Sequence, residues 1–156
     1  GTKVTAVDIS DGALDVASSQ NFAEEIERTE AVPPEFVKAD VLADVPTDGP
    51  FAEEFDIILS NPPYVMDKEK ALMRPNVLDH EPHLALFVSD DDPLIFYRSI
   101  ARSARKMLRS GGRIYYEIYE LLADEMCSML VDEGYINIRL REDFRGKKRM
   151  ICAEVE

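Results

Sequence analysis

Cysteine and tryptophan are scarce in this sequence. The 156 residues include no tryptophan and two cysteines, Cys127 and Cys152. Two distant cysteines form neither the dense disulfide framework of small secreted domains nor the paired ligands of a zinc site, so we expect buried, reduced thiols. No stretch approaches the roughly 18 consecutive apolar residues of a membrane span, and no secretory leader is recognisable. We therefore expect a cytoplasmic protein that does not contact a membrane.

Basic residues are also few, which bears on the choice of partner. The chain has 18 lysines and arginines against 31 aspartates and glutamates, a net charge of -13. Such a charge repels a phosphate backbone, so we expect no direct binding of nucleic acid. One basic cluster near the C-terminus is where an anionic partner would approach: Arg139, Arg141, Arg145, Lys147, Lys148 and Arg149.

Short apolar segments alternate with amphipathic ones, which predicts an α/β fold. Strands are expected over 3–9, 35–39, 55–59, 113–118, 135–140 and 149–155. Helices are expected over 13–30, 94–108 and 122–130. This alternation predicts a mostly parallel sheet, in one domain covering residues 1–156, with an antiparallel hairpin made by the last two strands. The irregular stretch 60–92 is too long for an idle connection and is expected to be functional.

Three predicted strands end on polar side chains, namely Asp8, Asp40 and Asn61. Ligands of open α/β sheets bind beyond the carboxyl ends of the strands, where an aspartate can accept hydrogen bonds from a ribose. An aspartate at a strand end also commonly forms a turn or caps a helix. For the two aspartates, both interpretations stay open.

The tetrapeptide Asn61-Pro62-Pro63-Tyr64 directly follows a predicted buried strand. Two prolines cannot continue a strand ladder and allow few backbone shapes, so they hold the neighbouring groups in fixed directions. The side-chain oxygen of Asn61 and the carbonyl of Pro62 are two acceptors that match the two N–H groups of a planar amine. Tyr64 offers a flat stacking surface. Orienting such an amine towards an electrophile suits methyl transfer from a sulfonium.

These residues resemble the signature of amino-group methyltransferases that use S-adenosylmethionine. The downstream segment "NVLDHEPHLALFVSDDDPLIFYRSI", with Glu81-Pro82, resembles one subfamily, the HemK/PrmC protein-(glutamine-N5) methyltransferases. These enzymes modify the glutamine of the Gly-Gly-Gln motif in peptide chain release factors. "VTAVDIS", "LRSGGRIYYEI" and "DFRGKKRM" resemble further segments of the same family, so the similarity covers essentially the whole chain.

The resemblance implies a Rossmann-like, class I S-adenosylmethionine-dependent methyltransferase fold and a release factor as the protein substrate. It implies that Asp8 holds the ribose of the cofactor, S-adenosylmethionine, and that Asp40 and Val41 lie beside the adenine. Asn61 would contact both cofactor and substrate.

It further implies that Pro62, Pro63 and Tyr64 complete the glutamine pocket. Asn61, Pro62 and Tyr64 are therefore the expected catalytic residues.

The chain departs from the family pattern in two places. It lacks the glycine-rich first strand and loop (acidic-x-Gly-x-Gly-x-Gly) and the preceding helical domain, so we expect a partial domain without its central strand, prone to self-association. The thermal stability of such a chain alone should not rise clearly on addition of S-adenosylmethionine. In addition, "EIYELLADEM" replaces a Glu-x-Gly-x-Gln run, which leaves the role of Glu117-Ile118-Tyr119 open.

Two other functions fit parts of the pattern. One is methylation of adenine N6 in DNA or RNA, with Tyr64 stacking on a flipped base. The other is a truncated, non-catalytic interaction module. No metal site is expected, because Pro82 interrupts the spacing of the two histidines in His80-Glu81-Pro82-His83 and because Asp90-Asp91-Asp92 reads as a solvated turn.

Overall fold

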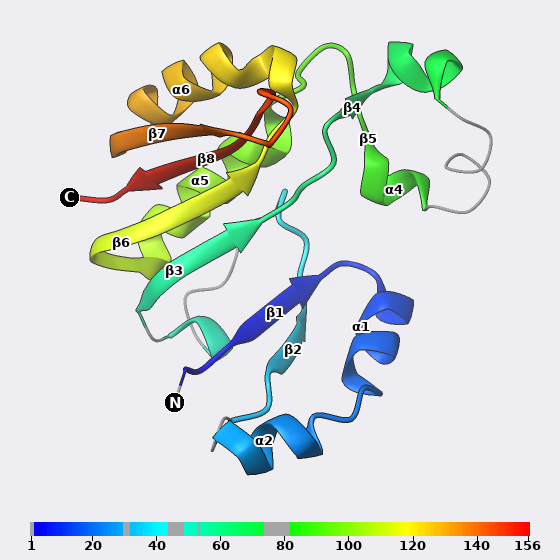
Figure 1. The fold of residues 1–156 in the computed structure, drawn as a ribbon, viewed down its shortest axis with the longest axis vertical. Helices are drawn as coiled ribbons and strands as arrows, with labels where there is room; N and C mark the ends of the chain where they lie inside the picture. The colour runs from blue at the N-terminus through cyan, green and yellow to red at the C-terminus, as the bar shows by residue number, and fades with distance from the viewer. Residues whose placement is uncertain (1, 30–31, 44–48, 53, 74–81) are drawn as a thin grey trace. The chain divides into compact units, whose positions relative to one another are not determined.

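The computed structural model describes residues 2–29, 32–43, 49–52, 54–73 and 82–156 (Figure 1). The chain divides into two compact units, Gly1–Glu53 and Glu54–Glu156, and each is described by itself. The elements of the first unit are β1 (Thr5–Asp8), α1 (Asp11–Ser18), α2 (Ala23–Thr29), β2 (Glu35–Lys38) and the 3-10 helix η1 (Gly49–Phe51). β1 and β2 pair in parallel, with Asp8 opposite Lys38.

The single helix expected over 13–30 is wrong, because α1 and α2 are separate helices. The hydroxyl of Ser18 donates to the carbonyl of Leu14 at 2.7 Å, and that of Ser19 donates to the carbonyl of Val16 at 2.8 Å. Such back-bonding competes with helix continuation. Asn21 Oδ1 then accepts a bond from the N–H of Ala23 at 3.0 Å, at the start of α2. A polar Ser-Ser-Gln-Asn run thus ends one helix and begins another.

The second unit holds a four-stranded sheet with the order β3-β6-β8-β7. β3 and β6 are parallel, whereas β8 is antiparallel to both of its neighbours, so the expected hairpin is confirmed. Its elements are β3 (Phe55–Ser60), β4 (Val65–Met66), η2 (Asp67–Leu72), α4 (His83–Leu86), β5 (Phe87–Val88), α5 (Ile95–Met107), β6 (Leu108–Glu117), η3 (Glu120–Leu122), α6 (Ala123–Asp132), β7 (Ile136–Glu142) and β8 (Lys148–Glu154).

The stretch 60–92, expected to be irregular, contains short regular elements. β4 and β5 form a small parallel sheet, in which Val65 lies opposite Phe87 and Met66 opposite Val88. Two-residue strands show no period in a sequence, and these two pair across more than 20 positions of the chain, which is why they could not be predicted. Residues 74–81 lie outside the described part of the chain.

The core of the second unit lies between its sheet and the helices α5 and α6, which run beside the strands in Figure 1. Two buried tyrosine hydroxyls find backbone partners there, since Tyr116 donates to the carbonyl of Tyr97 at 3.1 Å and Tyr135 to that of Ala101 at 2.8 Å. These hydroxyls therefore avoid the free-energy penalty of burying a polar group without a hydrogen bond. The fully buried large side chains are Tyr97, Ile114, Tyr116, Ile118, Met126, Leu130 and Ile151.

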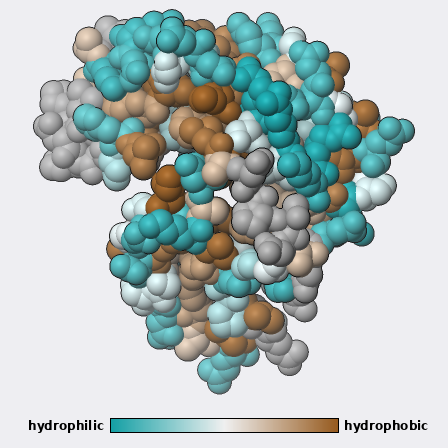
Figure 2. Space-filling model, turned by 180° about the vertical axis from the view of Figure 1, so that it is seen from behind, coloured by the Kyte–Doolittle hydropathy of each residue, from teal (hydrophilic) through white to brown (hydrophobic). Residues whose placement is uncertain are grey.

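β3 buries one face only. Ile58 packs against the core, whereas Ile57 and Leu59 point the other way and are 54% and 75% exposed. Figure 2 shows apolar residues reaching the surface at several places on the molecule. The alternation means that the second face of this edge strand is apolar and open.

The two cysteines agree only in part with expectation. Cys127 and Cys152 are both free thiols, but each is half-buried instead of buried. Burial raises the pKa of the Cys127 thiol, with a smaller contribution from Asp124.

Among the helices of the described ranges, none is both long and apolar enough to cross a membrane.

Gly134 ends α6 in a Schellman motif and should resist substitution. Its φ is +79°, its N–H bonds to the carbonyl of Val131, and a Cβ at this position would meet the guanidinium of Arg105. Gly134→Ala should lower the free energy of unfolding by about 1 kcal/mol from backbone strain, plus the cost of displacing Arg105. Urea denaturation of the wild type and the variant measures this loss in the free energy of unfolding.

Gly146→Ala is the matched control, because its φ is +76° and a Cβ there would meet nothing within 4 Å. Gly146→Ala should lower the free energy of unfolding only by the amount due to backbone strain, and therefore by less than Gly134→Ala does. Equal losses in the two variants would contradict the steric part of the argument.

Candidate active site

The carboxyl ends of β3 and β6 lie side by side. Ser60 pairs with Tyr116 in the parallel ladder, so Asn61 and Glu117 are the next residues on two neighbouring strands. Pro62 is buried, which anchors the turn, whereas Asn61 is exposed. Within the described part of the chain, the side-chain amide of Asn61 has no hydrogen-bond partner. Its oxygen is therefore open to a ligand at this edge of the sheet.

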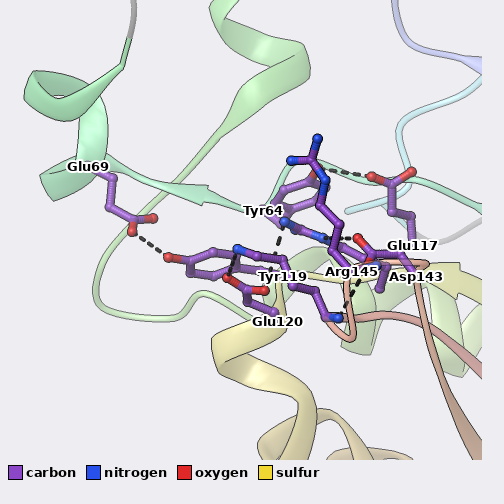
Figure 3. A network of polar contacts seen from close by, with 9 residues as sticks. Tyr64, Glu69, Glu117, Tyr119, Glu120, Asp143 and Arg145 are labelled. Atoms are coloured by element: carbon purple, nitrogen blue, oxygen red, sulfur yellow. Dashed lines mark hydrogen bonds and ion pairs between the residues drawn. The ribbon is translucent and has the colours of Figure 1, made fainter.

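Tyr64 lies over this edge and is held from two sides (Figure 3). Its hydroxyl donates to Glu117 Oε1 at 3.0 Å. Its ring stacks on that of Tyr119, with centroids 6.3 Å apart and an angle of 9° between the planes. The two hydroxyls point to opposite sides, since that of Tyr119 donates to Glu69 Oε1 at 2.6 Å. The stack thus bridges the end of β6 and the 3-10 helix η2.

This edge is tied to the core through Glu117. Its backbone carbonyl accepts the hydroxyl of Tyr97 at 3.0 Å, and Tyr97 is fully buried on α5. Burial, with a smaller effect of Tyr64, raises the pKa of Tyr97 well above its ordinary value of 10.0, so this phenol stays protonated and keeps donating. The position of Glu117 is therefore fixed by the ladder and by the core.

Tyr119 is held as a neutral phenol. The hydrogen bond to Glu69, followed by partial burial, raises the pKa of Tyr119 to about 12. The other oxygen of Glu69, Oε2, accepts the N–H of Met66 at 3.4 Å, which connects the pair to β4. This network links residues that are 50 positions apart in the sequence.

Three of the six residues of the basic cluster near the C-terminus are paired within the chain. Lys147 reaches Glu120 at 2.7 Å and Lys148 reaches Asp124 at 3.0 Å. Arg149 lies 4.0 Å from Glu120 and 3.9 Å from a second acid, Asp143. An anionic partner would have to compete with these carboxylates. The cluster is less available than its composition suggests.

In the first unit, Asp8 and Asp40 follow two parallel strands and lie at one edge. The N–H of Ala39 bonds to the carbonyl of Asp8 at 3.1 Å, one residue before Asp40. Asp8 Oδ1 accepts the N–H of Ser10 at 2.8 Å, and Asp40 Oδ1 accepts that of Leu42 at 2.9 Å. The turn-forming role is therefore confirmed for one oxygen of each. Both carboxylates are exposed.

The second oxygen of each aspartate has no partner within the described ranges and can accept a hydroxyl or an amine. Val41, half-buried, follows Asp40 directly.

The residues weighed as metal ligands do other things. Asp92 pairs with Arg98 at 2.7 Å, and Asp90 accepts the N–H of Lys68 at 3.2 Å. His80 and Glu81 lie outside the described residues. In the ranges that the structure describes, no group of three or more metal-ligating side chains comes together.

Comparison with known proteins adds a second line of argument. No protein-family model matches the chain. The release factor glutamine methyltransferase of Bacteroides thetaiotaomicron is 44% identical over 97% of this chain and 51% of its own length. That of Flavobacterium psychrophilum is 40% identical over 95% of this chain and 48% of its own.

Among solved structures, the release factor-specific protein-(glutamine-N5) methyltransferase of Alicyclobacillus acidocaldarius matches with a TM-score of 0.51 at 20% identity. The match covers 99% of this chain and 80% of that one.

The fold is the Rossmann-like α/β fold of class I methyltransferases, as expected. In sequence, the chain is a homologue of the release factor glutamine methyltransferases over nearly its whole length. It spans about half the length of these relatives. The resemblance read from Asn61-Pro62-Pro63-Tyr64 and its flanks is thereby confirmed.

Sequence reasoning missed Glu69 and left the roles of Glu117 and Tyr119 open. Glu117 had a usable signal, because it lies near the carboxyl end of a predicted strand, as Asn61 does. Glu69 had none, because only the folded chain brings it to Tyr119.

Glu69→Gln should lower the pKa of Tyr119 from about 12 towards its ordinary value of 10.0, because a neutral amide no longer disfavours the phenolate. Folding stability from this bond is complete below pH 10 and is lost as the pH rises towards 12, since the folded-state pKa is the higher one. Ultraviolet titration of tyrosine ionisation measures the shift, and Tyr119→Phe identifies the signal. An unchanged titration curve in Glu69→Gln would refute the assignment.

Proposed function

We propose that this chain forms part of the catalytic domain of a cytoplasmic S-adenosylmethionine-dependent methyltransferase that methylates N5 of the glutamine in the Gly-Gly-Gln motif of a peptide chain release factor. One observation carries the proposal: the exposed amide of Asn61, which has no partner among the described residues, follows β3 and precedes buried Pro62, in a chain 44% identical to a release factor glutamine methyltransferase. The catalytic domain is proposed to include residues 1–156.

Asn61 and Pro62 would hold the glutamine amide. The side-chain oxygen of Asn61 and the carbonyl of Pro62 accept its two N–H groups, and Pro63 and Tyr64 line the pocket. An amide nitrogen is a weak nucleophile because its lone pair is delocalised, so orientation matters more than a strong base. As the nitrogen attacks, positive charge develops on it, and two fixed acceptor oxygens stabilise that charge.

The first unit offers groups that suit the cofactor. S-adenosylmethionine supplies an electrophilic methyl group when bound. The open oxygen of Asp8 suits a ribose hydroxyl, and the open oxygen of Asp40, with the apolar side chain of Val41, suits an adenine. Both aspartates already hold their turns by the other oxygen, so their carboxylates are preorganised.

Methylation of adenine N6 is the second candidate, since adenine presents the same planar amine. The net charge of -13 and the internal pairing of Lys147, Lys148 and Arg149 weigh against a nucleic acid. A non-catalytic interaction module is the third candidate, and the substrate test below distinguishes it from the two methyltransferases.

The substrate test uses the full-length protein that carries this chain, with methyl-labelled S-adenosylmethionine. Label should appear on a release factor and be absent from a release factor whose Gly-Gly-Gln glutamine is replaced by alanine. Duplex DNA and structured RNA are parallel substrates. Label on either nucleic acid, or on the substituted factor, would sink the proposal, and absence of label everywhere would favour the non-catalytic module.

Asn61 and Asp8 should fail in different kinetic parameters. Asn61→Ala should lower kcat about 100-fold, because it removes a contact that strengthens as charge develops on the nitrogen. Asp8→Asn should raise the KM for S-adenosylmethionine about tenfold with a smaller effect on kcat, because it weakens a charge-assisted bond.

Asp132→Asn, a change on the exposed surface of α6, is the control and should alter neither parameter. The proposed roles are wrong if Asn61→Ala changes only KM or if Asp8→Asn matches the control.

A further inference from the structure

The ring of Tyr64 needs a support that its own backbone does not give. Pro62 and Pro63 restrict the main chain before it, but a tyrosine side chain keeps several rotamers. Tyr64 is half-buried, so packing alone fixes it only in part. A pocket wall for an amide group must present one ring orientation to be productive.

We infer that Glu117 and Tyr119 are positioning residues that fix the ring of Tyr64 beside Asn61, one by a hydrogen bond and the other by a parallel stack. This inference rests on the proposed function and assigns roles within the same site. The bond is 3.0 Å long from the Tyr64 hydroxyl to Glu117 Oε1, and the rings lie 6.3 Å apart at 9°. Neither residue contacts the amide or the methyl donor in this scheme.

Glu117 is suited to this role because its backbone is held in place on two sides. It pairs with Met150 in the ladder between β6 and β8, and its carbonyl accepts the hydroxyl of the buried Tyr97 at 3.0 Å. A carboxylate acceptor makes a stronger bond to a phenol than a neutral one does. The hydrogen bond to Glu117 thus ties the Tyr64 ring to the sheet.

Tyr119 is fixed from its far end. Its hydroxyl donates to Glu69 Oε1 at 2.6 Å, and Glu69 Oε2 holds the N–H of Met66 at 3.4 Å. The ring of Tyr119 covers one face of the Tyr64 ring, so it supports the wall of the proposed pocket from behind.

A double-mutant cycle tests whether Glu117 acts through Tyr64. In the full-length protein, Glu117→Ala and Tyr64→Phe should each lower kcat about tenfold, because each removes the same charged hydrogen bond. The double variant should be no slower than the slower single variant. Glu117→Gln should restore most of the activity, because its amide oxygen still accepts the hydroxyl. Multiplicative effects, about 100-fold in the double variant, would overturn the inference.

The stack is tested by Tyr119→Phe against Tyr119→Leu. Phenylalanine keeps the ring and should retain most of the activity, whereas leucine should raise the KM for the release factor about fivefold, in line with the worth of an aromatic pair. Tyr135→Phe is the matched control, since it also removes a hydroxyl bond but lies in the core. It should lower thermal stability without changing kcat or KM. A leucine variant with wild-type KM would overturn the role of the stack.

A readout without substrate separates this inference from the proposed function. In protein with ring-labelled tyrosine, NMR should show cross-peaks between the Tyr64 and Tyr119 rings, and the Tyr64 signals should shift and broaden in Glu117→Ala but not in Tyr135→Phe. If the wild type is inactive on release factors but these signals behave as stated, the proposed substrate is wrong and the positioning stands. If the wild type is active and the signals do not respond, the positioning is wrong.

Discussion

The parallel pairing of β3 with β6 is the constraint on which the site depends. Because Ser60 lies opposite Tyr116, the two strands end together and bring Asn61 next to Glu117. A shift of β3 by one residue would turn Ile58 away from the core, so burial of this apolar side chain also secures the alignment of the polar ones. Chemistry at the edge is therefore fixed by packing beneath it, through Tyr97 and the ladder to β8.

Much of this arrangement could be read from the residues, and the reasons are local. β-branched runs marked the strands, and Asp8, Asp40 and Asn61 stood where parallel strands end. The break between α1 and α2 was missed because serine and asparagine side chains compete with the helix by bonds that a pattern of apolar spacing ignores. Glu69 was missed because its partner, Tyr119, lies 50 positions away and no periodicity reports such a contact.

Several basic side chains of this protein form ion pairs with its own carboxylates and are therefore less available to a partner. The chain carries an excess of acid, yet Glu120 and Asp124 hold Lys147 and Lys148 at 2.7 and 3.0 Å, and Arg149 lies 3.9 Å from Asp143. The carboxylates at the proposed site instead accept from neutral tyrosine hydroxyls. A surface that carries carboxylates repels a polyanion, so a polypeptide loop with a neutral glutamine suits it better.

The stacked pair Tyr64 and Tyr119 also gives the site a near-ultraviolet spectroscopic signal. This chain has no tryptophan, so aromatic absorption above that of phenylalanine comes from six tyrosines alone. Two of them lie nearly parallel, and each donates to a carboxylate, an arrangement that shifts and couples their electronic transitions. The chain thus carries two chromophores at the place where a substrate amide would enter, and they contribute to the near-ultraviolet circular dichroism of the native protein together with the buried pair Tyr97 and Tyr116.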